Sequence, residues 1–237
     1  MINNNKIKKI NFVTLTAMFC AIAYVVMFVL KISGIGCFLT FDIKDAIIAT
    51  GSMVLGPLTG IIIAFLVALL EMITVSSTGP WGALMNFVSS AVFAGCASAV
   101  YNYMPGIKKK ISGAWGGLGV AIIATTVTMM GMNLLITPIY TKMPVSGVAE
   151  MIIPLLLPFN LIKTVLNASI VMVIYKPISI ILRRSGFVST ATHAEKENQV
   201  YFSKLSLFVF LCSAIIGVVC VVLLIEVFGG DFNLFKK

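Results

Sequence analysis

The stretch PLLLPFNLIKTVLN at residues 154–167 places three polar side chains inside an apolar segment that is long enough to cross a bilayer. These are Asn160, Lys163 and Asn167, which at about 100° per helical residue fall within roughly a 60° arc. An ionisable group in hydrocarbon costs at least about 2.5–3.5 kcal/mol, so such a lysine indicates a functional site. The alternative is a lysine that snorkels to the lipid headgroups. Lys163 lies roughly 13 Å along the helix from Pro154, near mid-depth, which favours the functional interpretation.

The composition of the whole chain indicates a polytopic membrane protein. Of its 237 residues 59% are hydrophobic and only 11% are charged, and the mean hydropathy is +1.08, which excludes an ordinary soluble domain. The formal net charge is +9, but the basic residues form short clusters between apolar runs, a pattern typical of membrane orientation rather than nucleic-acid binding. A single histidine, His193, and five cysteines without CxxC spacing predict neither a metal site nor a disulfide framework.

The order of apolar segments predicts an all-α bundle of membrane-spanning helices. We expect six helices in the first part of the chain and one additional helix near the C-terminus, over residues 12–30, 43–55, 58–75, 81–103, 114–136, 152–174 and 205–228. Only Gly56 and Pro57 separate the second segment from the third, so these two helices should form a tight hairpin. The predicted organisation is a six-helix membrane body (1–184), a polar cytoplasmic linker (185–202) and an additional transmembrane helix with a short tail (203–237).

The distribution of basic residues predicts a cytoplasmic N-terminus. With that orientation the inner loops and the N-terminal segment carry eleven Lys and Arg residues, and the outer loops and the C-terminal tail carry four. An excess of Lys and Arg marks the cytoplasmic side of a membrane protein. We therefore expect a multi-pass protein of the cell membrane whose N-terminus is inside.

This orientation places several polar side chains at the outer end of the bundle. Glu71, Asn86, Asn133 and Asn160 all lie in the outer halves of their predicted helices. Polar groups that line a shared cavity are tolerated in a membrane, whereas groups that face lipid are expelled, so we expect a pocket open to the outside with Lys163 near its floor. The alternative is that these groups cap helices or join them by hydrogen bonds. Capping is the preferred interpretation for three residues at predicted helix ends: Asp42, Asp45 and Thr137.

Several catalytic and energy-coupling motifs are missing from the sequence. It contains no Gly-rich phosphate-binding loop with a lysine, so the chain is not expected to hydrolyse ATP itself. It contains no HExxH, no GxSxG and no paired intramembrane aspartates, so an intramembrane hydrolase has no support. It also shows no inverted repeat of the kind that many secondary transporters have. A binder of a small molecule, not an enzyme, is the interpretation that remains.

Four short segments carry a resemblance to a known family. They are FLTFDIKD at 38–45, STGPWGALMNF at 77–87, PFNLIK at 158–163, and the small residues Ala17 and Ala21, spaced four apart in the first helix. With these segments the body, from Lys6 to about residue 184, resembles the substrate-binding S component of energy-coupling factor (ECF) vitamin transporters, and most closely the riboflavin-specific type. The last predicted helix departs from the six-helix pattern of that family and would place the C-terminus outside.

The resemblance implies a transported ligand, a set of contacts and a set of partners. The ligand would be riboflavin, with no separate cofactor, and the expected substrate contacts are Leu39, Thr40, Glu71, Asn86, Asn133, Asn160, Lys163 and Asn167. Ala17 and Ala21 would contact a transmembrane coupling subunit, a role that raises this pair above ordinary helix packing. Two cytoplasmic ATPases would supply the energy, and the S component would topple in the membrane to deliver its vitamin.

Two other function classes stay open from the sequence. One is an S component for a different small molecule, such as a thiamine-like or lipid-precursor ligand, because pocket residues alone do not define the vitamin. The other is a membrane assembly protein without a ligand, in which the polar stripe of residues 160, 163 and 167 joins helices. A yellow colour of the purified protein would separate both from the riboflavin hypothesis.

Overall fold

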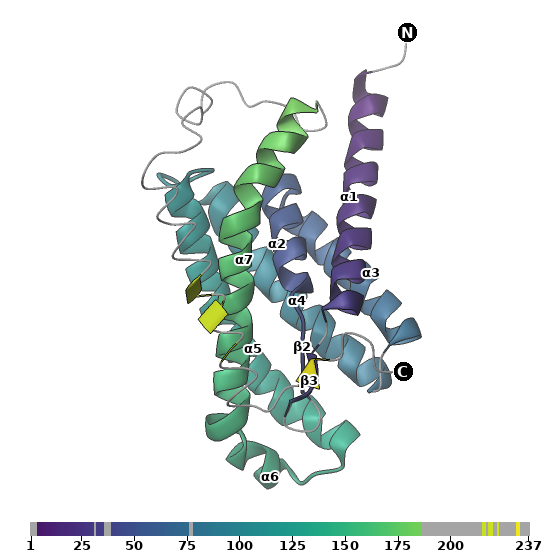
Figure 1. The fold of residues 1–237 in the computed structure, drawn as a ribbon, viewed down its shortest axis with the longest axis vertical. Coiled ribbons are helices and arrows are strands. Elements are labelled where there is room, and N and C mark those ends of the chain that lie inside the picture. Colours follow the sequence, from purple (N-terminus) through teal and green to yellow (C-terminus); the bar gives the residue numbers. More distant parts are fainter. Residues whose placement is uncertain are drawn as a thin grey trace.

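The computed structural model describes residues 4–30, 32–35, 39–75 and 78–185, together with positions 215, 216, 218, 219, 222, 231 and 232. Within these residues the helices lie side by side in one bundle (Figure 1), so the predicted all-α membrane bundle is confirmed. The predicted linker, 185–202, lies outside the described residues except for its first residue. The additional helix predicted at 205–228 is described at five positions only, all of them helical.

Five helices are long and apolar enough to cross a membrane in the part of the chain that the structure describes. They are α1 (Asn4–Val29), α3 (Pro57–Thr74), α4 (Gly79–Tyr103), α5 (Ile111–Thr141) and α7 (Leu157–Arg184). The shorter elements are α2 (Lys44–Leu55), α6 (Val145–Glu150) and a π-helical turn, η1 (Ile152–Leu156). With 12 residues, α2 is about 18 Å long, which is less than the hydrocarbon thickness. The number of helices that cross the membrane therefore stays a prediction.

The α2–α3 connection has the expected form of a tight hairpin. Gly56 has φ of +112°, a conformation that side chains with a Cβ rarely adopt, and its backbone N–H donates to the Ser52 carbonyl at 2.7 Å. Pro57 opens α3 at a position where its missing N–H needs no partner. The two helices therefore reverse direction over a single connecting residue.

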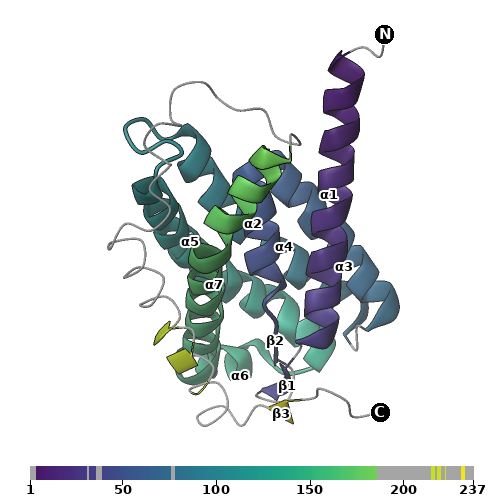
Figure 2. The ribbon, with the colours of Figure 1, turned by 45° about the horizontal axis from the view of Figure 1, so that its top comes forward.

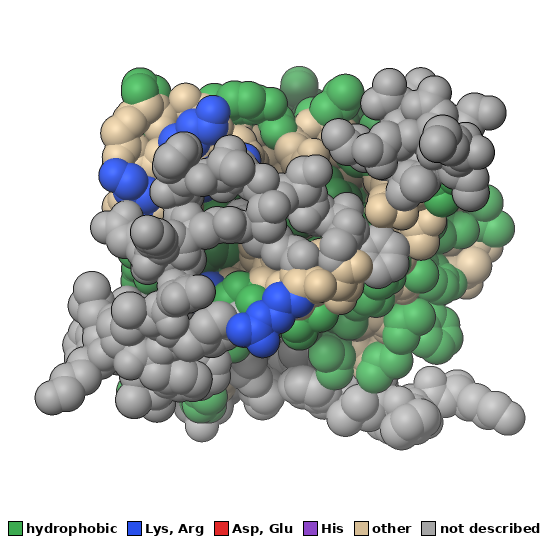
Figure 3. Space-filling model, turned by 90° about the horizontal axis from the view of Figure 1, so that it is seen from above, with side chains coloured by type: hydrophobic (Ala, Val, Ile, Leu, Met, Phe, Trp, Pro, Cys, Tyr) green, Lys and Arg blue, Asp and Glu red, His purple; other side chains and the backbone are tan. Residues whose placement is uncertain are grey.

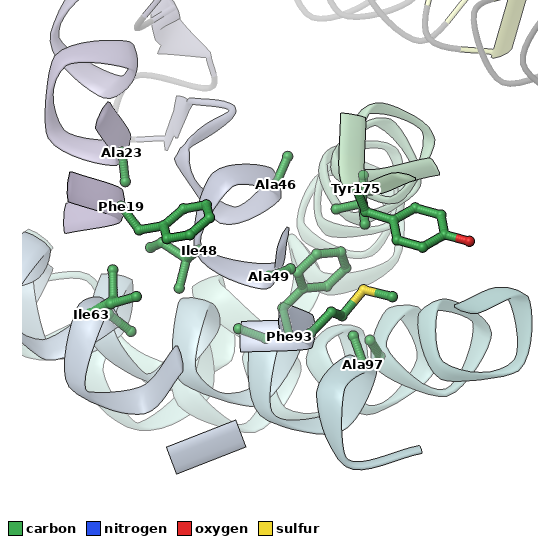
Figure 4. Packing of buried hydrophobic residues seen from close by; sticks show 14 of the residues in the cluster. Phe19, Ala23, Ala46, Ile48, Ala49, Ile63, Phe93, Ala97 and Tyr175 are labelled. Atoms are coloured by element: carbon green, nitrogen blue, oxygen red, sulfur yellow. The ribbon is translucent and has the colours of Figure 1, made fainter. Parts of the chain in front are cut away.

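The core forms around α2, which packs against α1, α3, α4 and α7. Figure 4 shows Phe19 of α1 beside Ile48, and Phe93 of α4 close to Ala49, with all four side chains buried. At Gly51 a Cβ would lie 2.8 Å from the Phe19 ring, so a glycine there lets α1 approach closely. Small residues along α2 thus allow large side chains from the neighbouring helices to meet around it.

The loop between α1 and α2 contributes two strands to a small sheet that was not predicted from the sequence. β1 (Ile32–Ile35) pairs antiparallel with β2 (Leu39–Phe41) on one side and with β3 (Asp231–Phe232) on the other. Figures 1 and 2 place this sheet at the end of the bundle opposite the N-terminus. Residues 231–232 therefore lie next to β1, on the side of the bundle where the sequence predicts the C-terminus.

The loops predicted to be cytoplasmic gather at one end of the bundle. The start of α1, the α4–α5 turn with Lys108–Lys110, and the end of α7 share that end (Figure 2). Viewed from this side, Lys and Arg side chains stand out among the coloured residues (Figure 3). This arrangement agrees with the loop assignment, and the orientation of the bundle in the membrane stays a prediction.

Candidate substrate-binding site

A cavity lies between β2 and the helices α3, α4, α5 and α7, in the half of the bundle away from the N-terminus. Its volume is about 80 Å³. Its wall combines apolar and polar side chains and contains Leu39, Thr40, Glu71, Thr78, Gly82, Met85, Asn86, Ser89, Met129, Asn133, Tyr140, Phe159, Asn160 and Lys163. A wall of this kind offers flat apolar surface together with a few hydrogen-bonding groups, as small-molecule sites do.

The structure brings seven of the eight predicted substrate contacts to this one cavity. They come from four helices and a strand that are far apart in the sequence: Leu39, Thr40, Glu71, Asn86, Asn133, Asn160 and Lys163. The eighth, Asn167, lies one turn beyond Lys163 on α7 and is not part of the cavity wall. The convergence expected at the outer end of the bundle is therefore present in the structure, and ligand contact stays a prediction for each residue.

Two of the three asparagines in the wall, Asn133 and Asn160, are held by their own helices. Asn133 donates from Nδ2 to the Met129 carbonyl at 2.7 Å, and its Oδ1 accepts a hydrogen bond from Thr137 at 3.0 Å. Asn160 donates from Nδ2 to the Leu156 carbonyl at 2.8 Å. An amide group can form four hydrogen bonds, so both side chains are oriented and still have capacity for a ligand. Thr137 was expected to cap a helix, and that expectation was wrong.

The geometry of Asn160 depends on the unusual start of α7. In the π-helical turn the Leu156 backbone N–H donates to the Met151 carbonyl, five residues back, at 3.0 Å. Pro154, inside this turn, and Pro158, in the first turn of α7, cannot donate backbone hydrogen bonds and disturb the ordinary helical pattern there. The Leu156 carbonyl that accepts from Asn160 belongs to the same turn. The proline pair thus shapes the segment that presents Asn160 to the cavity.

A buried ionic network, formed by Asp42, Lys44, Asp45, Glu71 and Lys163, lies against the cavity. Lys44 Nζ is 2.6 Å from Glu71 Oε2 and 3.4 Å from Asp42 Oδ2. Lys163 Nζ is 3.3 Å from the same Asp42 oxygen and 4.0 Å from Asp45 Oδ2. Ser90 donates a hydrogen bond to Asp45. All five charged side chains are at least nine-tenths buried, so protein groups and not bulk solvent surround them.

This network corrects two interpretations made from the sequence. Asp42 and Asp45 were expected to cap α2, but no side chain caps that helix from its N-cap residue, and both carboxylates face lysines instead. Lys163 is only 7% exposed and lies beside a carboxylate, so the snorkelling interpretation was wrong. Buried charges are costly unless they are paired, which explains why these groups occur together.

Asn167 performs the capping role that was expected of the aspartates. Its Oδ1 accepts the backbone N–H of Ala46, in the first turn of α2, at 2.9 Å. Its Nδ2 donates to the Asp42 carbonyl at 3.3 Å and to the Lys163 carbonyl at 3.0 Å. Unpaired N–H groups at a helix start need such acceptors. Asn167 therefore joins α7 to the start of α2, next to the cavity and outside its wall.

Sequence reasoning missed Lys44 as a member of this site. Lys44 is 1% exposed, and its charge is matched by Glu71 from another helix. The signal was present, because a lysine between two aspartates opens an apolar segment, and a charge buried there requires a partner of opposite sign. Tyr140 was also missed, although it lies seven residues after Asn133 and hence on the same face of α5.

The small-residue strip of α1 lies on its outer surface. Ala17 and Ala21 are exposed, whereas Leu15, Phe19 and Ala23 face the core. Packing within the bundle therefore does not account for the strip, and its proposed role as a docking surface stays a prediction.

Comparison with known proteins agrees with this fold and site. Residues 11–175 match the family model described as "ECF transporter, substrate-specific component". The chain belongs to this family. It is 28% identical over 178 residues to a protein named "Riboflavin transporter RibU" from Staphylococcus aureus (strain TCH60), an alignment that covers 71% of this chain and 90% of the relative. The family is a class of transporter component, not a class of enzyme.

The fold is also similar to a solved structure of this family. The structure is described as "Structure and mechanism of the S component of a bacterial ECF transporter". The similarity has a TM-score of 0.61 at 27% identity and covers 77% of this chain and 100% of the other.

Proposed function

We propose that the protein is the riboflavin-binding subunit of an ECF transporter and captures the vitamin in the cavity between β2, α3, α4, α5 and α7. The observation that carries this proposal is the convergence of Lys163, Asn160 and Asn133 on one cavity in a chain similar to a riboflavin transporter. The family supports a transported small molecule, and the relative supports the choice of riboflavin.

The chemistry of the wall suits a flavin. A flat, largely apolar ring system can lie against Leu39, Met85, Met129 and Phe159, while its carbonyls and hydroxyls need fixed donors and acceptors. Lys163 is a charged donor, and the amides offer both donors and acceptors. A buried polar group left without a partner costs about 1–3 kcal/mol, so a ligand lacking the matching groups is penalised.

Binding requires the cavity to widen. Its volume of about 80 Å³ is below the roughly 300–1,000 Å³ of typical small-molecule sites. Met85 and Met129 line it, and methionine side chains adapt readily because they have several rotatable bonds. β2 lines it as well and is a short strand of three residues. We expect the methionines and β2 to move outward when the ligand enters.

Delivery of the vitamin requires partners that supply the energy. We expect a transmembrane coupling subunit to dock on the exposed strip of Ala17 and Ala21, because two small residues four apart allow another helix to approach closely. The sequence has no phosphate-binding loop, so ATP hydrolysis would come from two cytoplasmic ATPases in the same complex.

Titration of the purified protein with riboflavin tests the proposal. Flavin fluorescence should be quenched to a one-to-one end point, because the ring enters a wall that contains amide and aromatic groups. Thiamine, titrated in parallel by calorimetry, should give no heat of binding. If micromolar riboflavin gives no quenching and thiamine or another vitamin binds instead, riboflavin is not the substrate. The assignment to the family would not be affected by that result.

A further inference from the structure

Two charged residues of the cavity wall are joined to each other behind the wall. Glu71 of α3 and Lys163 of α7 line the cavity, whereas Asp42, Lys44 and Asp45 do not. The connection runs from Glu71 to Lys44 at 2.6 Å, from Lys44 to Asp42 at 3.4 Å, and from Asp42 to Lys163 at 3.3 Å. Asp42 is therefore the direct partner of the ammonium group that enters the cavity wall.

Asp42 is fixed in place by features independent of Lys163. Its backbone carbonyl accepts a hydrogen bond from Asn167 at 3.3 Å, and its Oδ2 is also paired with Lys44. It follows β2 directly, so the residue that faces Lys163 is two positions after Thr40, which itself lines the cavity. Its other oxygen, Oδ1, is buried without a hydrogen-bond partner. The Asn167 hydrogen bond and the Lys44 ion pair therefore fix this carboxylate although one of its oxygens has no hydrogen-bond partner.

We propose that Asp42 is the positioning residue of the site: it holds the Lys163 ammonium at the cavity wall and ties it to β2. This inference rests on the proposed function, since it assumes that Lys163 contacts riboflavin. A lysine side chain has four rotatable bonds, and without a fixed partner its ammonium would occupy several positions. With Asp42 in place the ammonium is already oriented when the ligand arrives, and that lowers the cost of binding.

The competing explanation is that Asp42 only stabilises the fold. Both explanations predict that replacing Asp42 harms the protein, so stability alone does not separate them. They differ in how the loss depends on Lys163. A positioning residue acts through the ammonium and has nothing to position once the ammonium is gone. A purely structural residue affects affinity in the same way whether or not Lys163 is present.

The experiment is a double-mutant cycle on the purified full chain, with riboflavin affinity and ligand-free melting temperature measured for each protein. The variants are Asp42→Asn, Lys163→Met and the double variant. We expect Asp42→Asn to weaken binding by at least about tenfold in the wild-type background. In the Lys163→Met background the same change should alter affinity by less than about twofold. Glu150→Gln, which removes an exposed carboxylate outside the network, is the matched control and should bind as wild type does.

Each outcome decides between the explanations. Equal losses in the two backgrounds, or no loss in either, would overturn the positioning role. If Asp42→Asn does not fold, Asp42→Glu takes its place, because it keeps the charge and moves the carboxylate by about 1.5 Å; the same dependence on Lys163 is expected. Failure of the wild type and of Glu150→Gln to bind riboflavin would instead reject the proposed function, so the two failures are distinguishable.

Discussion

The N-terminal end of α2 carries buried charged groups in addition to the Asn167 amide that binds it, whereas the described contacts at its C-terminal end come from a hydroxyl and an amide and include no charge. Near the start, Lys44 and Asp45 belong to the buried ionic network. Near the end, Ser98 of α4 donates to the Ser52 carbonyl at 2.6 Å, and Asn102 donates to the Met53 carbonyl at 3.2 Å. Both ends are buried and both are polar, yet only the charged end adjoins the cavity.

The difference shows what each kind of contact contributes. Neutral hydrogen bonds between membrane helices stabilise the bundle by about 1 kcal/mol each. The desolvation cost of a neutral polar group is small once the group is hydrogen-bonded. Burying a charged group costs several kcal/mol of desolvation per ion, and this cost offsets much of the attraction between the ions. A buried ionic network therefore adds little net stability to the fold. Its place beside the cavity is consistent with a role in binding, and the following variants test the contrast.

Lys44→Met is expected to have the largest effect on stability. It removes a lysine that pairs with Glu71 and with Asp42, so two buried carboxylates each lose a nearby positive charge. The expected loss is about 3–5 kcal/mol of unfolding free energy. Reversible denaturation in detergent or lipid would measure it.

A matched pair of variants checks the cause of that loss. Lys44→Met combined with Glu71→Gln removes both charges of the 2.6 Å pair and should be less destabilising than Lys44→Met alone. If the single variant loses less than about 1 kcal/mol, the network is not the strong interaction that its burial implies.

Lys163→Ala and Asn160→Ala should mainly change affinity. Both residues line the cavity, and removal of a hydrogen bond to a ligand in a dry site costs about 1–3 kcal/mol of binding free energy. Lys163→Ala also leaves Asp42 with one cation fewer, so its melting temperature should fall as well. Asn160→Ala loses only a bond to its own helix and should melt close to wild type. Unchanged affinity of the folded fraction would show that neither residue binds the ligand.

The contrast between these residues also shows what the sequence could predict. The stripe of Asn160, Lys163 and Asn167 is a local property, because helical geometry alone fixes which residues share a face. Loop charges and segment lengths are equally local, so the order of helices and the gathering of polar groups at one end were predictable. Within the stripe, however, Asn167 bonds to the start of α2 and does not line the cavity. The spacing of the three residues does not predict this difference.

Features that depend on contacts between distant segments were not predictable in the same way. The pair of Lys44 and Glu71 joins residues 27 positions apart, and Asn167 bonds to Ala46 across 121. The same holds for β1 and β2, which lie in a loop too short to show a clear alternating pattern. The π-helical turn was hidden because Pro154, inside the turn, and Pro158, just after it, lie in an apolar run that is also typical of a plain helix.

Ser98→Ala tests the neutral end of α2 and should have a smaller effect. The hydroxyl donates to the Ser52 carbonyl and accepts from Asn102 at 3.1 Å, so its loss should cost about 1 kcal/mol of stability. Ser98 does not line the cavity, and riboflavin affinity should stay within about twofold of wild type. Ser112→Ala, an exposed position at the start of α5, is the control and should change neither quantity. A tenfold loss of affinity in Ser98→Ala would mean that the two ends of α2 do not act separately.

The smallest effect on the isolated protein is expected on the outer surface of α1, where neither kind of polar contact is involved. Ala17 and Ala21 are exposed, so Ala17→Trp or Ala21→Trp places the large side chain outside the core, and riboflavin affinity should change by less than about twofold. Uptake of riboflavin by cells should nevertheless be abolished, because a bulky side chain prevents another helix from approaching a small-residue strip. Ile123→Trp is the matched control: that side chain is 68% exposed on α5, which lies across the bundle from α1 (Figure 2), and both binding and uptake should persist. Binding and uptake lost together in the α1 variants would mean that the strip supports the bundle itself. If uptake survives both substitutions, the coupling subunit docks on another face of the protein. A helix docked on the strip could not approach it past a tryptophan side chain.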